Sequence, residues 1–168
     1  MLIIFGGLPG VGKTAIAREL ARRTGAVYLR IDSIEEAMRA SGVVSRPLDD
    51  AGYRAAYAVA EDNLRLGRTV VADSVNPLPV TRRAWLAVAN RAQVRAIEIE
   101  VVCSDIDEHR RRVETRIADL PGFRLPAWNE VASREYQAWD SANLVIDTAN
   151  RNVEQCLGLI VEALSPRP

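Results

Sequence analysis

The chain has few of the residues that build metal centres or disulfide frameworks. Its 168 residues include two cysteines, Cys103 and Cys156, and a single histidine, His109. The cysteines form no C-x-x-C pair, which argues against a zinc site or a disulfide, and we expect both to be small buried hydrophobes. A lone histidine cannot build a histidine metal cluster, so we expect His109 to have a structural or surface role.

The chain also lacks an excess of charge and a long apolar run. Lys and Arg together number 22, as do Asp and Glu, and this zero net charge argues against a nucleic-acid partner. No apolar stretch is long enough to cross a membrane, and the apolar N-terminus has no basic segment before it, unlike a signal peptide. We therefore expect a single cytoplasmic domain that spans residues 1–168.

Short apolar runs alternate with helical patterns along the chain. The runs are continuous, which is typical of strands buried on both faces of a parallel sheet. Their alternation with helices predicts a doubly wound α/β fold, in which ligands bind beyond the carboxyl ends of the strands. The predicted strands are Leu2–Phe5, Ala26–Ile31, Thr69–Ala72, Arg95–Val102 and Leu144–Ile146. The predicted helices are Gly12–Thr24, Ser33–Ala40, Asp50–Leu66, Val80–Ala92, Asp105–Ala118, Trp128–Ala138 and Asn152–Ala163.

The first predicted strand enters a glycine-rich turn that opens a helix. The turn fits the phosphate-binding pattern G-x-x-x-x-G-K-S/T in full. Its glycines let backbone N–H groups curl around an anion, and the helix N-terminus adds its dipole. Lys13 can reach the β- and γ-phosphates, and the Thr14 hydroxyl can ligate Mg²⁺. The pattern predicts that a nucleotide is bound by Gly7, Leu8, Pro9, Gly10, Val11, Gly12, Lys13 and Thr14.

Polar residues follow the second and third predicted strands. Asp32 can accept or orient the proton of a substrate hydroxyl, and it can also cap the next helix. Asp73 occupies the position that holds Mg²⁺ in phosphate-loop enzymes, or it contacts substrate. Asn76 can bind substrate or hold the turn, because Asp, Ser, Asn and Pro are common turn residues. We predict that Asp32 is catalytic, that all three bind substrate, and that Asp73 also binds the metal.

The predicted helix 105–118 carries a run of arginines. We expect Ile106, Val113 and Ile117 to form its apolar stripe. His109, Arg112 and Arg116 are expected on the neighbouring face. Two arginines four residues apart can clamp a transferring phosphate, and the alternative is a solvated basic face paired with nearby glutamates. The whole segment, about residues 105–139, can form a lid or pack locally through its aromatic residues.

These features together resemble the small P-loop kinases. The resemblance covers nearly the whole chain and rests on the phosphate loop, the segment Arg30–Met38 with Asp32, the Asp73–Asn76 turn, the Arg112-x-x-x-Arg116 pair and Asp147-Thr148. The chain is most similar to the group of predicted kinases and chloramphenicol phosphotransferase-like P-loop NTPases, with gluconate kinase and adenylylsulfate kinase as broader relatives. The resemblance implies a three-layer fold with a five-stranded parallel sheet of order 2-3-1-4-5 and a small helical lid. It also implies that Asp32 is the base and that Arg112 and Arg116 are lid arginines.

The sequence predicts an ATP-dependent phosphotransferase that uses ATP and Mg²⁺ and phosphorylates a hydroxyl of a small-molecule acceptor. We expect the acceptor to bind between the helices after Asp32 and Asp73, with residues 41–50 at its border. Two alternatives stay open: a polynucleotide 5′-kinase or toxin-type nucleotide-sugar kinase, and a nucleotide-binding switch or ATPase without an acceptor. No pattern indicates an oligomeric state, names the acceptor or distinguishes ATP from GTP.

Overall fold

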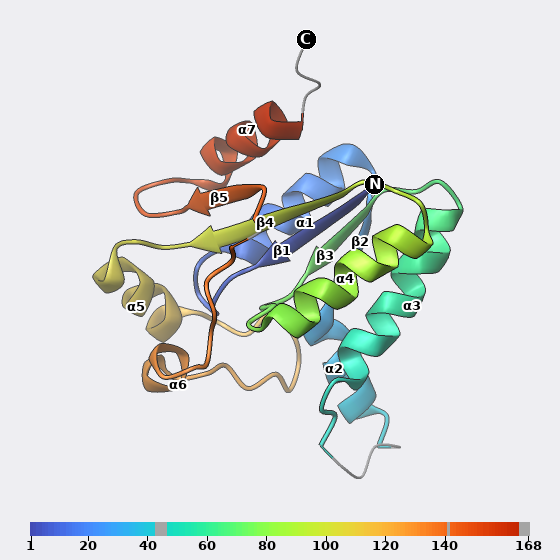
Figure 1. Ribbon diagram of the computed structural model, residues 1–168. Helices are drawn as coiled ribbons and strands as arrows, with labels where there is room; N and C mark the ends of the chain where they lie inside the picture. The colour runs from blue at the N-terminus through green and yellow to red at the C-terminus, as the bar shows by residue number, and fades with distance from the viewer. Residues whose placement is uncertain (43–46, 141, 165–168) are drawn as a thin grey trace.

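The core of the structure is a parallel sheet of five strands. The computed structural model describes residues 1–42, 47–140 and 142–164. The strands are β1 (Leu2–Gly6), β2 (Val27–Arg30), β3 (Val70–Asp73), β4 (Ala96–Val102) and β5 (Leu144–Asp147). Their order, β2-β3-β1-β4-β5, and their parallel pairing confirm the predicted topology (Figure 1). The carboxyl ends of all five strands therefore meet at one edge, where the phosphate loop follows β1.

Helices cover both faces of the sheet, because the central strand β1 is apolar throughout. Leu2 and Ile4 belong to one core cluster and Ile3 and Phe5 to the other, and all four are at most 1% exposed. The Ile3 cluster includes residues of α1 (Lys13–Thr24) and α7 (Val153–Leu164). The Leu2 cluster includes residues of α3 (Ala51–Arg65) and α4 (Pro79–Arg91). The result is the expected three-layer arrangement.

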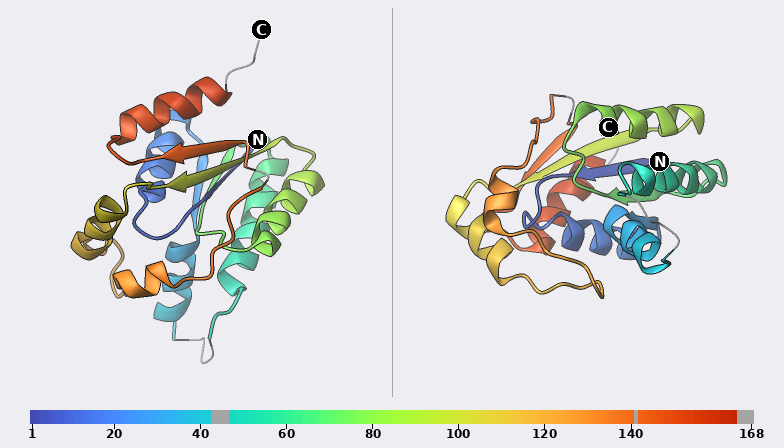
Figure 2. Two further views of the ribbon diagram at one scale, coloured as in Figure 1. Left: turned by 60° about the vertical axis from the view of Figure 1, so that its left-hand side comes forward. Right: turned by 90° about the horizontal axis from the view of Figure 1, so that it is seen from below.

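The remaining helices lie around the carboxyl edge. They are α2 (Ile31–Ala40), which packs on α3, and α5 (Ile106–Thr115) and α6 (Trp128–Ala132), which lie between β4 and β5 in the chain. Both views in Figure 2 place α5 and α6 beyond the carboxyl ends of the strands. The segment 105–139 therefore lies where a lid over this edge would lie, and we call it the lid segment.

The second helix of the lid segment is shorter than predicted. α6 ends at Ala132 rather than Ala138. Beyond it, the buried Arg82 of α4 donates hydrogen bonds to the carbonyl oxygens of Gln137 and Ala138, and the Gln137 N–H donates to Pro77 O at 2.9 Å. A continued helix would need these backbone groups for itself, so the tertiary contacts replace the helical ones.

The two cysteines are free thiols with different surroundings. Cys156 in α7 is buried as predicted, but Cys103 is partly exposed and its Sγ lies 3.4 Å from Asp105 O. Within the described ranges, no helix combines the length and the apolar character that a membrane span requires.

Candidate active site

The phosphate loop joins β1 to α1, and its shape depends on glycine. Gly7 has a φ of 139° and donates its N–H to Val75 O at 3.0 Å. A Cβ atom at Gly7 would lie 2.2 Å from Val101 O in β4, so no other residue fits without a shift. Gly12, with a φ of 95°, is the N-cap of α1, and Lys13 is the first helical residue. The loop therefore lies tightly against β4 and ends at the anion-binding end of a helix.

Lys13, the single lysine of the chain, is nearly enclosed. The residue is 7% exposed. Burial lowers the pKa of Lys13 from its ordinary value, while the carboxylates of Asp73 and Asp32 raise it in part. The positive charge of Lys13 is therefore stabilised by these carboxylates, and a bound phosphate would stabilise it further.

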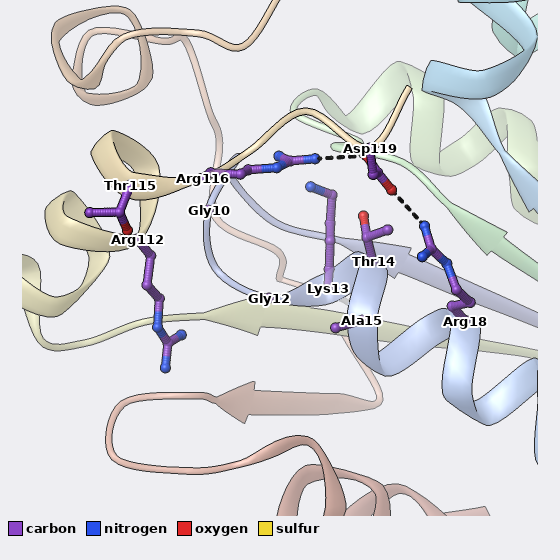
Figure 3. Close-up of a pocket in the computed structure, with 10 residues that line it drawn as sticks. All are labelled: Gly10, Gly12, Lys13, Thr14, Ala15, Arg18, Arg112, Thr115, Arg116 and Asp119. Carbon is purple, nitrogen blue, oxygen red and sulfur yellow. Dashed lines mark hydrogen bonds and ion pairs between the residues drawn. The ribbon is translucent and has the colours of Figure 1, made fainter. Parts of the chain in front are cut away.

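Two cavities meet at Lys13 and Arg116. The smaller, of about 390 Å³, is lined by the phosphate loop and the start of α1 together with Arg18 and Asp119. The larger, of about 730 Å³, is lined by residues of α2, including Asp32, and by the lid segment. Figure 3 shows Arg116 reaching over Lys13 toward Asp119. Because both cavities have Lys13 and Arg116 in their walls, these two cations lie between the phosphate-loop cavity and a second cavity of small-molecule size.

Asp32 lies in the wall of the larger cavity, but it does not cap a helix. The N-cap position belongs to Arg30, which is extended (φ −110°, ψ 119°), and α2 begins at Ile31 rather than Ser33. Asp32 is therefore in the first turn of α2, where the helix dipole favours a carboxylate. Its Oδ2 accepts a long hydrogen bond of 3.5 Å from Arg30 Nη2, and its side chain is 33% exposed. The capping interpretation is wrong, and the carboxylate is open to the cavity.

Asp73 ends β3 beside the phosphate loop and is 2% exposed. Its Oδ2 accepts a 2.7 Å hydrogen bond from Tyr28 Oη, and burial, with the negative charge of Asp73, raises the pKa of Tyr28 and keeps it protonated. Within the described part of the chain, Asp73 Oδ1 has no hydrogen-bond partner. A buried carboxylate oxygen without a partner is costly. The residues fit Mg²⁺, because Asp73 Oδ1 and the hydroxyl of Thr14 are the oxygen donors that this ion takes, directly or through water.

Asn76 lies in the turn after β3 and is 0% exposed, with a φ of 48°. Its Nδ2 donates to Phe5 O at 2.8 Å, and its backbone N–H donates to Tyr53 Oη at 3.2 Å. Its backbone carbonyl oxygen accepts a hydrogen bond from Arg82 Nε at 3.0 Å. Of the two roles expected for Asn76, these contacts favour holding the turn over binding substrate.

The predicted apolar stripe of α5 is confirmed at Val113, which is 7% exposed, and is wrong at its other two residues. Ile106 and Ile117 are 67% and 87% exposed, whereas His109 is buried. His109 takes the inner position because its Nε2 lies 2.8 Å from Pro9 O in the phosphate loop, and its ring packs edge-on against Trp128 with centroids 5.2 Å apart. The single histidine has a structural position that joins the lid segment to the phosphate loop.

The two predicted lid arginines diverge. α5 ends at Thr115, short of the predicted end at residue 118, because Arg116 is extended (φ −65°, ψ 136°) and leaves the helix. Arg112 donates to Thr148 Oγ1 at 2.8 Å and to Thr148 O at 3.0 Å, and Figure 3 shows it pointing away from Arg116. Arg116 forms an ion pair of 3.8 Å with Asp119. Both arginines line the smaller cavity, so contact with phosphate stays a prediction for each, from two different directions.

Three further residues, Arg18, Arg30 and Asp119, belong to the site although no role was predicted for them. Asp119 accepts hydrogen bonds from Arg30 Nη1 at 2.7 Å, from Arg30 Nη2 at 3.0 Å and from Arg18 Nη2 at 2.7 Å. The hydrogen bonds from Arg30 and Arg18 hold the pKa of Asp119 well below its usual range. One signal was present in the sequence: an arginine at the end of an apolar strand needs a carboxylate partner if it is buried. The sequence separation of 89 residues hid that partner.

Comparison with known proteins places the chain in a family. A family model described as an AAA domain matches residues 2–121, more than half of the chain. The chain belongs to the AAA domain family. A shikimate kinase from Frankia casuarinae is 30% identical to it, over an alignment that covers 98% of this chain and 73% of that protein.

Solved structures share the fold over nearly the whole chain. A protein from Chloroflexus aurantiacus j-10-fl has a TM-score of 0.76 and 21% identity, with 98% of each chain covered. The Mycobacterium tuberculosis APS kinase, in complex with AMPPNP and APS, has a TM-score of 0.72 and 21% identity, with 97% of this chain and 96% of that one covered. This member of the AAA domain family is a small P-loop kinase-like protein and an ATP-dependent kinase.

Proposed function

We propose that this P-loop kinase moves the γ-phosphate of ATP to a hydroxyl of a small-molecule acceptor that binds in the larger cavity. One observation carries the proposal: the phosphate-loop cavity and the cavity of about 730 Å³ have Lys13 and Arg116 as common wall residues. A γ-phosphate held by these two cations faces the second cavity. A switch or an ATPase that uses water has no need for a second cavity of this size at that place.

Each residue has a defined task in the transfer. The acceptor hydroxyl oxygen bonds to the γ-phosphorus, the bond from that phosphorus to the β–γ bridging oxygen breaks, and ADP leaves. Asp32, in the wall of the acceptor cavity, takes or orients the hydroxyl proton. Lys13 and Arg116 stabilise the charge of the transferring oxygens. Thr14 and Asp73 would hold Mg²⁺, which would neutralise charge on the β- and γ-phosphates.

The walls of the larger cavity suit a hydrophilic acceptor. Charged side chains of both signs line it, and Glu35 pairs with Arg39 at 3.1 Å. Asp49 and Asp50 of the predicted border segment also line it, and residues 43–46 of that segment lie outside the described residues. A compound rich in hydroxyl groups can exchange its hydration for hydrogen bonds to these side chains.

An acceptor panel tests the proposal. Shikimate, gluconate, APS, glucose and nucleosides are each supplied with MgATP, and acceptor-dependent ADP release is measured together with the phosphorylated product. We expect one class to stimulate ADP release and Asp32→Asn to lower that stimulated rate by about 100-fold or more, with ATP binding by calorimetry retained. The matched control is Asp62→Asn. Asp62 is exposed near the carboxyl end of α3 and lines neither of the two cavities. Steady ATP hydrolysis that needs neither an acceptor nor Asp32 would instead identify a switch or an ATPase.

A further inference from the structure

Arg30 is a buried cation at the carboxyl end of β2, and its side chain is 2% exposed. Its guanidinium donates to both carboxylate oxygens of Asp119, at 2.7 and 3.0 Å. The same Nη2 atom donates to Asp32 Oδ2 at 3.5 Å. One planar fork therefore bridges two carboxylates, one in the wall of the acceptor cavity and one in the lid segment.

Asp119, the carboxylate of this bridge in the lid segment, is also connected to a cation of the phosphate-loop cavity. Asp119 lies between α5 and α6 and also pairs with Arg116, the cation that lines both cavities. Figure 3 shows the chain of contacts from Arg116 to Asp119 and on to Arg18. Arg30 thus connects Asp32 to Asp119. Asp119 in turn pairs with Arg116, which lies over Lys13.

Stability alone is a weak reason for this arrangement. Removing a guanidinium from water costs several kcal/mol, and a buried ion pair often recovers no more than that cost. Among the described residues, Arg30 Nε has no hydrogen-bond partner, so the burial of this side chain is not fully compensated. A rigid fork does, however, fix the orientation of two carboxylates relative to each other, which a lysine cannot do.

We propose that Arg30 is a positioning residue for phosphoryl transfer. Through its hydrogen bonds to Asp32 and Asp119, it fixes the position of the Asp32 carboxylate relative to the lid segment. This proposal rests on the proposed function, because it assigns Asp32 to the acceptor hydroxyl. Arg30 touches no reacting atom and acts through its two carboxylate partners. A misplacement of the proton acceptor by about 1 Å is enough to slow a transfer by about 100-fold.

Arg18 is the matched control for Arg30. It donates to Asp119 at 2.7 Å, the same distance as Arg30 Nη1, but its side chain is 55% exposed. Arg18 lies in α1, and its ion pair with Asp119 leaves the bridge from Arg30 to Asp32 in place. Loss of Arg18 therefore loosens one end of the network, and loss of Arg30 loosens both.

The test compares Arg30→Met, Arg30→Lys and Arg18→Met with the wild type. Hydrogen exchange is followed in residues 31–40 and 116–124, and kcat and KM are measured with the fastest of shikimate, gluconate, APS, glucose and nucleosides. We expect Arg30→Met to raise exchange in both segments and to lower kcat by about 100-fold, with the KM for ATP changed by less than about threefold. Arg18→Met is expected to raise exchange in residues 116–124 alone. Arg30→Lys keeps the charge. We therefore expect its melting temperature to match that of the wild type, and its kcat to stay as low as that of Arg30→Met.

The outcomes separate the two proposals. If Asp32→Asn abolishes transfer but Arg30→Met keeps kcat within about threefold, Arg30 is structural and the proposed function stands. Unchanged exchange in residues 31–40 of Arg30→Met, or full recovery of kcat by Arg30→Lys, also overturns the positioning role. If no probe is phosphorylated and Asp32→Asn has no effect on ATP turnover, the proposed function fails and the role of Arg30 fails with it.

Discussion

The hydrogen bond between Tyr28 and Asp73 gives a quantitative test of the burial and charge of Asp73. Tyr28→Phe removes the hydroxyl that donates to Asp73 Oδ2 at 2.7 Å and leaves the ring in place. Asp73 is 2% exposed, and within the described residues its Oδ1 already has no partner. The substitution therefore leaves a buried carboxylate without the neutral donor that stabilises its charge.

The expected cost follows from the kind of bond that is lost. A hydrogen bond to a charged group contributes about 1.5–3 kcal/mol, so we expect Tyr28→Phe to lower the free energy of unfolding by about 2 kcal/mol. For a chain of this length, that corresponds to a fall in melting temperature of about 6 °C. In an Asp73→Asn background the acceptor is neutral, and the same substitution is expected to cost about 1 kcal/mol. The difference between these two costs is the coupling energy between the Tyr28 hydroxyl and the charge of Asp73.

Thermal unfolding followed by calorimetry, without nucleotide, measures these costs. Tyr57→Phe is the matched control, because the Tyr57 hydroxyl donates to a neutral acceptor, Thr81 O, at the longer distance of 3.3 Å. We expect this control to cost about 1 kcal/mol or less. Two results would show that Asp73 is not a buried, charged acceptor. One is that Tyr28→Phe lowers the free energy of unfolding no more than Tyr57→Phe does. The other is that Tyr28→Phe lowers it equally in the wild type and in the Asp73→Asn background.

Three further predictions concern the loop, the lid and the lysine. Gly10→Ala places a Cβ atom 2.4 Å from Val113 Cγ2 at a φ of 87°, so we expect a loss of about 1–3 kcal/mol of stability and weaker ATP binding by calorimetry, and unchanged binding would contradict the loop geometry. Asp119→Asn is expected to lower the melting temperature near neutral pH. The depressed pKa of Asp119 stabilises the fold above the unfolded carboxyl pKa of about 3.9, and this contribution is lost as the pH falls toward the folded pKa. The difference between Asp119→Asn and the wild type should therefore shrink in calorimetry at about pH 3, and a constant difference would count against the ion pairs. The pKa of Lys13, the single lysine, is expected to lie below its ordinary value of 10.5 in an NMR titration, and Asp73→Asn should lower that pKa further. A pKa at or above 10.5 would contradict the expectation that the effect of burial outweighs the effect of the two carboxylates.

The sheet and the phosphate loop follow from local patterns in the sequence. The continuous apolar run of β1 requires cover on both faces, which is a property of neighbouring residues and needs no distant contact. The loop from Gly7 to Thr14 is also a local signal, because each glycine and Lys13 act through their own backbone and side-chain chemistry. The positions of Asp32 and Asp73 followed from the same argument, since the ends of parallel strands meet at one edge.

The connections between the side chains of that edge depend on contacts between distant parts of the chain. The turn of the chain at Arg116 separates it from Arg112, and helical periodicity could not reveal this because it assumes a helix that continues. His109 is buried by contact with Pro9, which lies 100 residues away in the chain, although its neighbours suggested a solvated face. The bridge from Asp32 through Arg30 to Asp119 likewise joins residues whose sequence carries no shared pattern. Local patterns thus predict the phosphate loop, and long-range ion pairs, which form only once the chain is folded, connect the lid segment to the larger cavity.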